Sequence, residues 1–337
     1  MRLPRASQPA QLKAFALILA GLLVYSTPTW SQDDTSAAEE TVDIPWVLDF
    51  AKAKEQAKGE GKDLLINFTG SDWCGWCKRL EGEVFSKKEF LDEAAKKYVF
   101  VYLDFPMNEE AKAKVVDEKL NEELRTSYGV QGFPTIILTD QGGNPFGRTG
   151  YQPGGPTAYN EHLAKLQGDG AKVKELIAAG DAVSDEQLSA AFPFLMSQEL
   201  ISYSGYSHLL DQAEKIPALS QEVAAYRNNQ KLNSMLSQPE PDWDQVHAFL
   251  DTEGLAGPDF LNACWATATM YLAEKHQFLA AIKVLEKMLQ DPILKDNAQG
   301  QKMINDKISE LRESEKNHDD DHDHDDDHSH DGHDHGG

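Results

Sequence analysis

The sequence predicts a mixed α/β domain that is followed by an all-α domain. Between residues 44 and 168, short runs rich in β-branched and aromatic residues alternate with helical patterns, which is typical of a mixed sheet covered by helices on both faces. From residue 169 to 315 the apolar periodicity is helical throughout. At 337 residues the chain has room for both domains.

The N-terminus has the pattern of a secretory signal peptide. Arg2, Arg5 and Lys13 precede an apolar run at residues 14–24, and a polar stretch with small residues follows it. The run is shorter than the ~20 residues that span a bilayer, so we expect residues 1–31 to be removed and the mature chain not to insert stably in a membrane. The protein is therefore predicted to be exported, to the periplasm in a Gram-negative host and otherwise as a secreted protein.

An acidic linker at residues 32–43 leads into the α/β domain. The composition predicts helices at 47–58, 87–97, 109–127 and 156–167 and strands at 63–68, 98–104 and 134–139. In the helical domain, the segment 268–292 resembles one tetratricopeptide unit, and a plain helical bundle is the alternative.

The motif Trp-Cys-Gly-Trp-Cys at residues 73–77 follows a predicted strand and opens a helical pattern. A rise of ~1.5 Å per residue and 3.6 residues per turn would place the Cα atoms of Cys74 and Cys77 about 5 Å apart, within the range of a disulfide. Because a helix N-terminus stabilises an anion, the pKa of the Cys74 thiol should lie below that of free cysteine. Cys74 is the predicted nucleophile and Cys77 the resolving thiol.

Two other roles are open to such a pair. It could be half of a zinc site, but the sequence has no second Cys-x-x-Cys to complete four ligands. It could also be a structural disulfide, but so short a loop removes little entropy from the unfolded chain. The spacing therefore favours redox chemistry, which needs no cofactor.

A second motif lies downstream, where residues 128–138 read Tyr-Gly-Val-Gln-Gly-Phe-Pro-Thr-Ile-Ile-Leu, before turn residues at 140–144 and Gly150. Together with the cysteine motif, this segment resembles the thioredoxin-like superfamily over residues 44–168. The resemblance implies a thioredoxin fold and a thiol:disulfide oxidoreductase that acts on protein disulfides and thiols with an unidentified redox partner.

The resemblance also implies a substrate-binding surface. In that family the proline of the Gly-x-Pro-Thr segment is cis and faces the cysteine pair, which would place Pro134 beside Cys74. The residues that the resemblance assigns to this apolar docking surface are Trp73, Trp76, Phe133, Pro134 and Gly150.

Two residues depart from the family pattern. Thioredoxins place a buried Asp before the active site to assist proton transfer to the resolving thiol, and here that position is Asn67, which leaves the role vacant or gives it to water or to Asp72. The residues between the cysteines are Gly75 and Trp76, without the His that stabilises the thiolate of strong oxidants. The direction of electron flow is therefore left open.

The formal net charge of −24 makes nucleic acid and anionic membrane surfaces poor partners. A lone cysteine, Cys264, lies on a helical stretch and is predicted to be a buried small hydrophobe, with an intermolecular bridge as the alternative.

The tail at residues 316–337 combines histidine and aspartate and has nothing apolar, so it is predicted to be disordered. Imidazoles at this spacing favour Zn²⁺, Ni²⁺ or Cu²⁺. The candidate metal ligands are His318, His322, His324, His328, His330, His333 and His335. They support an alternative function, a metal-binding or scaffold protein that uses the tail and the helical domain, with the thioredoxin unit as a binding module.

Overall fold

The computed structural model describes residues 42–322, and its side chains up to His318. The predicted signal peptide, nearly all of the acidic linker and the tail beyond His322 lie outside the described residues. Within that part of the chain, no helix is both long enough and apolar enough to cross a membrane.

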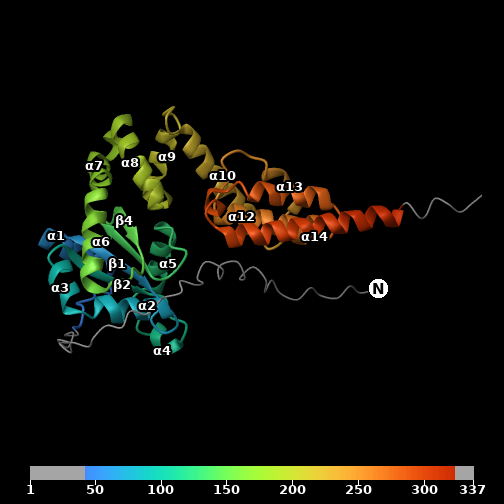
Figure 1. The fold of residues 1–337 in the computed structure, drawn as a ribbon. Coiled ribbons are helices and arrows are strands. Elements are labelled where there is room, and N and C mark those ends of the chain that lie inside the picture. The colour runs from blue at the N-terminus through green and yellow to red at the C-terminus, as the bar shows by residue number, and fades with distance from the viewer. Residues whose placement is uncertain (1–41, 323–337) are drawn as a thin grey trace, which may run out of the picture. The chain divides into compact units, whose positions relative to one another are not determined.

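The α/β domain is built on a four-stranded sheet with the strand order β2-β1-β3-β4 (Figure 1). The central strand β1 (Asp63–Thr69) is parallel to β2 (Tyr98–Asp104) and antiparallel to β3 (Thr135–Thr139). The edge strand β4 (Pro145–Thr149) is antiparallel to β3. This mixed sheet confirms the predicted fold class.

Helices cover both faces of this sheet, as Figure 1 shows. The helices of this region are α1 (Phe50–Glu60), α2 (Gly75–Leu80), the π-helical turn η2 (Glu81–Phe85), α3 (Lys88–Ala94), α5 (Glu118–Ser127) and α6 (Gly155–Asp169), and the short helix α4 (Glu109–Lys112), which buries no residue.

The alternation of side chains along β1 builds two cores. Leu64, Ile66 and Phe68 belong to a buried cluster with Phe50 and other residues of α1. The opposite face of the sheet carries the register partners Leu65 and Phe100, and Asn67 and Tyr102. On that face the rings of Phe85, Phe90 and Tyr159 pack around Phe100 or one another at centroid distances of 5.0–6.1 Å. The helix that carries Cys77 therefore covers the same face as Asn67.

The predicted strands all form, and two elements differ from the prediction. The helix expected at 109–127 is two helices, because Asn108 caps α4 and Asp117 caps α5, each side chain accepting a backbone N–H at its own helix start. The sequence did not predict β4, whose Pro145 is tolerated because it opens an edge strand.

Helices α7 (Ala171–Ala179), α8 (Asp185–Ser197) and α9 (Ser207–Ala213) belong to the same compact unit as the sheet. The Tyr206 hydroxyl donates a hydrogen bond to the Pro145 carbonyl at 2.8 Å, and the Tyr203 ring stacks on Tyr128 at a centroid distance of 5.1 Å. The chain accordingly divides between Val223 and Ala224, later than the predicted boundary at 168/169.

The second unit is all-α, as predicted. Its helices are α10 (Ser220–Leu236), which crosses the division, α11 (Trp243–Phe249), α12 (Pro258–Ala266) with the π-helical turn η6 (Thr267–Leu272), α13 (Phe278–Met288) and α14 (Ala298–His322). The tetratricopeptide resemblance stays a prediction.

Helix α14 corrects one predicted boundary. It continues to His322, so residues 316–322 are helical, although the sequence predicts disorder from 316 onward. The buried residues Ile304, Ile308 and Leu311 anchor the helix to the core of the second unit. Once a helix is anchored, adding residues costs less than starting a new one, so it extends into the polar segment.

Candidate active site

The turn between β1 and α2 delivers the cysteine pair. The Cys74 N–H donates to the Gly70 carbonyl at 2.9 Å, and Cys74 is the N-cap of α2 with an extended backbone. A Cβ at Gly70 would come within 2.5 Å of the Trp73 indole, so this turn requires glycine. The local sequence thus fixes the first cysteine at the entrance of the helix.

Cys74 and Cys77 form a disulfide, with Cα atoms 5.3 Å apart, close to the predicted separation. The Cys77 N–H donates to Cys74 Sγ at 3.2 Å. In the reduced protein, this donor and the helix N-terminus favour the thiolate of Cys74. The two residues are 4% and 6% exposed, so exposure does not distinguish them, whereas their position in the helix does.

An aromatic group lies beside the pair. The Trp73 indole Nε1–H donates to the Phe105 carbonyl at 2.8 Å, and its ring meets the Phe133 ring edge-on at a centroid distance of 5.7 Å. Phe105 and Phe133 also contact each other, at 5.2 Å. The Phe133–Pro134 peptide bond is cis, as the resemblance implies.

The predicted site residue Gly150 lies against the cis-proline segment. A Cβ on Gly150 would lie 2.9 Å from the Pro134 carbonyl oxygen. The fully buried Tyr159 holds Gly150 in place, because its hydroxyl donates to the Gly150 carbonyl at 3.0 Å. Only glycine fits this approach without a shift of the backbone.

Trp76 has partners that the sequence did not reveal. The residue is 56% exposed, and its ring packs against the Tyr151 ring at a centroid distance of 5.1 Å, while the guanidinium of Arg79 lies over both rings. The Tyr151 hydroxyl donates to Glu83 at 2.5 Å, and Arg79 donates to the same carboxylate at 2.7 Å. These two donors, Tyr151 first, lower the pKa of Glu83. Trp76 is thus held on the surface next to the disulfide.

Asn67 is almost fully buried, at 4% exposure, and its Oδ1 has no hydrogen-bond partner among the described residues. It lies on the sheet face covered by the helix of Cys77. An amide cannot accept the proton of a thiol in the way that a carboxylate does. Asn67 therefore cannot take the proton-transfer role that the family gives to its buried Asp.

Asp72 does not fill the role that Asn67 leaves vacant. Its carboxylate accepts hydrogen bonds from the N–H groups of Met107 and Asn108 and from the Asn108 amide, at 2.6–3.1 Å. These bonds, led by the Asn108 N–H, lower the pKa of Asp72. Asp72 is therefore committed to holding this loop.

Glu81 is a carboxylate that was not predicted to be part of the site. Its N–H donates to the Cys77 carbonyl, so Glu81 lies one helical turn after Cys77 on the same side of the helix. Burial, with a smaller contribution from Asp43, raises the pKa of Glu81. A carboxyl group of raised pKa one helical turn from a resolving thiol is a candidate for proton transfer.

The third cysteine is not part of the site. Cys264 is fully buried in the second unit, and burial raises the pKa of its thiol to about 12. The prediction that it is a buried small hydrophobe is confirmed, and an intermolecular bridge through it would require the core to open.

The predicted metal ligands are mostly outside the described residues. Of their side chains the structure describes that of His318, whose ring lies 5.3 Å from the His276 ring by centroids. Within residues 42–318 no group of three or more His, Cys, Asp or Glu side chains could hold a metal ion.

Comparisons with known proteins agree with this geometry. Residues 50–167 match the family model described as a thioredoxin-like domain. The chain is 34% identical over 110 residues to the disulfide bond reductase DsbH of Chlamydia pneumoniae, covering 33% of this chain and 65% of DsbH. It is 26% identical over 202 residues to the thioredoxin-related protein DsbJ of the same organism, covering 60% of this chain and 52% of DsbJ. The matches thus span less than two thirds of either relative.

A solved structure, described as DsbH oxidoreductase, aligns with 28% identity over 44% of this chain and 94% of that one, with a TM-score of 0.32. The sheet, the disulfide at the start of α2 and the cis-proline, together with the family match, define residues 50–167 as a thioredoxin-like domain.

Proposed function

We propose that the protein is an exported thiol:disulfide oxidoreductase whose redox centre is Cys74 and Cys77. The observation that carries this proposal is the disulfide at the entrance of α2, with the Cys77 N–H donating to Cys74 Sγ. The predicted signal peptide supports export, and outside the cytoplasm protein disulfides persist as substrates. The names of the relatives DsbH and DsbJ support the same class of reaction.

In the reducing direction, the Cys74 thiolate attacks one sulfur of a client disulfide. A bond forms between Cys74 and that sulfur, and the client's other sulfur leaves as a thiolate, which takes up a proton. Cys77 then loses its proton and attacks Cys74 Sγ, which releases the second client thiol. The client gains two electrons and two protons, and the protein is left with the disulfide seen in the structure.

The proton of Cys77 needs an acceptor, and we assign this role to Glu81. Asn67 cannot perform it, and Asp72 is engaged with the loop at residues 107–108. Glu81 follows Cys77 by one turn, and its raised pKa makes its carboxylate a better base than an exposed glutamate.

Clients would dock on the aromatic surface around the disulfide. Trp73 and Trp76 are 42% and 56% exposed, and Met107 is 66% exposed. Large exposed apolar side chains around a reactive group are typical of a protein-binding surface. With Phe133 and Pro134 they would hold an extended client segment against Cys74.

The order of the two cysteines is tested by trapping. Cys77→Ala should accumulate mixed disulfides with exported client proteins, because nothing resolves the bond to Cys74. Cys74→Ala should accumulate none. Equal trapping by both variants, measured on non-reducing gels and by mass spectrometry, would contradict the assigned order.

We also propose metal binding as a second, separable property of the tail. The packing of His318 against His276 favours this candidate, since it holds one imidazole of the series at a fixed place beside another. Removal of residues 318–337 should abolish binding of Zn²⁺, Ni²⁺ or Cu²⁺ in calorimetry and leave disulfide reduction unchanged. If the truncated chain still binds these metal ions, the tail is excluded as the metal site.

A further inference from the structure

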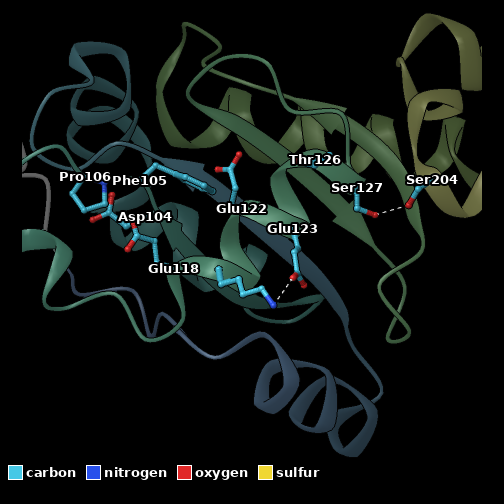
Figure 2. A pocket seen from close by; sticks show the side chains of 10 residues that line it. Asp104, Phe105, Pro106, Glu118, Glu122, Glu123, Thr126, Ser127 and Ser204 are labelled. Atoms are coloured by element: carbon cyan, nitrogen blue, oxygen red, sulfur yellow. Dashed lines mark hydrogen bonds and ion pairs between the residues drawn. The ribbon is translucent and has the colours of Figure 1, made fainter.

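A groove of about 960 Å³ runs along the outer side of α5. Its long wall is formed by the α5 residues Glu118, Lys119, Glu122, Glu123, Thr126 and Ser127. Figure 2 shows Phe105 and Pro106 at one end of the groove and Ser127 and Ser204 at the other. The hydroxyls of Ser127 and Ser204 are hydrogen-bonded at 2.7 Å and close that end.

The Phe105 end of the groove joins the proposed docking surface. The Phe105 ring contacts Phe133, which precedes the cis-proline, and the Phe105 carbonyl accepts the hydrogen bond of Trp73, which precedes Cys74. A client chain that lies on Phe133 and Pro134 therefore has a continuous path into the groove. The side chains that flank the client cysteine would reach it.

The lining of the groove is acidic. Its charged residues are Asp104, Glu118, Glu122 and Glu123, against the single cation Lys119. The Glu123–Lys119 ion pair, at 3.4 Å, joins side chains that are 60% and 87% exposed. Exposed pairs of this kind contribute little free energy, so a client cation can compete with them.

Two other carboxylates have fixed partners at the edges of the groove. Glu122 is paired with Arg125 at 2.5 Å, and Asp104 accepts hydrogen bonds from the N–H and hydroxyl of Ser71 at 2.9 and 2.6 Å. Glu118 is the first residue of α5. The groove therefore keeps an excess of negative charge next to an apolar wall formed by Phe105 and Pro106.

We propose that this groove binds a segment of the client polypeptide that carries lysine or arginine near the disulfide to be reduced. The aliphatic stem of such a side chain would pack on Phe105 and Pro106, and its cationic head would lie among the glutamates of α5. The inference rests on the proposed function and adds a substrate class to it: disulfides in basic sequence contexts.

The test uses the full mature chain in its reduced form. Three peptides share one cysteine, in a mixed disulfide with a small uncharged thiol, and differ in whether the flanks are basic, uncharged or acidic. The groove variant is Glu118→Lys/Glu122→Lys. The matched control is Glu55→Lys/Glu186→Lys, which makes the same change in net charge at exposed positions on α1 and α8.

Wild type should reduce the basic peptide fastest. The groove variant should lose this preference by about five-fold or more in kcat/KM, the scale of a few exposed charge contacts. The control should keep the preference. Equal rates for the three peptides with wild type, or equal losses in both variants, would overturn the proposal.

Two further measurements separate the possible failures. Reduction of a small uncharged disulfide tests the proposed function alone, and it should be unchanged in the groove variant. Binding of a cysteine-free basic peptide, measured by calorimetry, tests the groove alone and should weaken in that variant. If sedimentation shows that the groove variant dissociates a dimer, the occupant is a second copy of the chain, and the client proposal is wrong.

Discussion

Gly150 lies so close to Pro134 that a Cβ atom at residue 150 would be 2.9 Å from the Pro134 carbonyl oxygen. Contacts this short are essentially absent between real Cβ atoms and backbone oxygens, so a side chain at residue 150 must displace the cis-proline segment. The segments that precede β3 and follow β4 are thus fitted to each other at the open end of this hairpin.

Gly150→Ala should therefore lower kcat/KM for a protein disulfide by about ten-fold, the scale expected when a docking surface is displaced by a fraction of an ångström. A small disulfide, which does not need that surface, should be reduced at nearly the wild-type rate. Gly132→Ala is the matched control, because a Cβ there has no neighbour within 4 Å. Equal loss in both variants would argue against a special role for residue 150.

Replacement of Glu81 should have opposite effects on stability and activity. Burial raises the pKa of Glu81 in the folded protein, so this residue lowers stability as pH rises from its unfolded pKa through its folded pKa. Glu81→Gln should thus raise Tm relative to wild type at pH 7, and have little effect at pH 4. If Glu81 accepts the proton of Cys77, the same variant should resolve mixed disulfides about 10²-fold more slowly near neutral pH.

Stopped-flow kinetics of mixed-disulfide resolution over pH would report this loss. Glu83→Gln is the control, since Glu83 has a lowered pKa and is bound to Tyr151 and Arg79. A Glu81→Gln variant that resolves at the wild-type rate would remove Glu81 from the mechanism.

Loss of the Tyr151 hydroxyl should release Glu83. The hydrogen bond from Tyr151 is the largest cause of the lowered pKa of Glu83, so Tyr151→Phe should move that pKa up toward its ordinary value. An NMR titration of the Glu83 carboxyl would measure the shift, and Tyr203→Phe serves as a control outside this network. An unchanged pKa would contradict the observed pairing.

Substitution of Cys264 should affect stability without affecting redox activity. The thiol is fully buried, so Cys264→Ser would place a hydroxyl in an apolar core and should cost about 1–3 kcal/mol of unfolding free energy. Cys264→Ala leaves only a small cavity and should cost less. Chemical denaturation measures both. A matching loss of disulfide reduction in either variant would show that Cys264 takes part in the chemistry.

Local patterns in the sequence predicted much of the fold. The β-rich runs at 63–68 and 98–104 became β1 and β2 within a residue, because apolar and aromatic residues make up most of each run. Strand β4 escaped prediction, since Pro145, Gly147 and Arg148 give it no strand signal and only its pairing with β3 makes it a strand. The later domain division escaped too, because it depends on contacts such as Tyr206 with Pro145.

The candidate site was predictable in part. The cysteines, the cis-proline and Gly150 lie in compact motifs, and the structure has the disulfide, the cis bond and the close approach of Gly150 to Pro134. The partners of Trp76 were not predictable, because Tyr151 and Glu83 are distant in the sequence and meet only in the fold. The raised pKa of Glu81 likewise arises from burial, which no local pattern encodes.

The most direct test of the central claim is the identity of the thiol that reacts first. The reduced protein is treated with limiting iodoacetamide at pH 6 to 7, and the modified cysteine is identified by peptide mass mapping. Cys74 should be alkylated first, with an apparent pKa below that of free cysteine, because the Cys77 N–H and the start of α2 stabilise its thiolate. Preferential alkylation of Cys77, or a Cys74 pKa at or above about 8.5, would contradict the account.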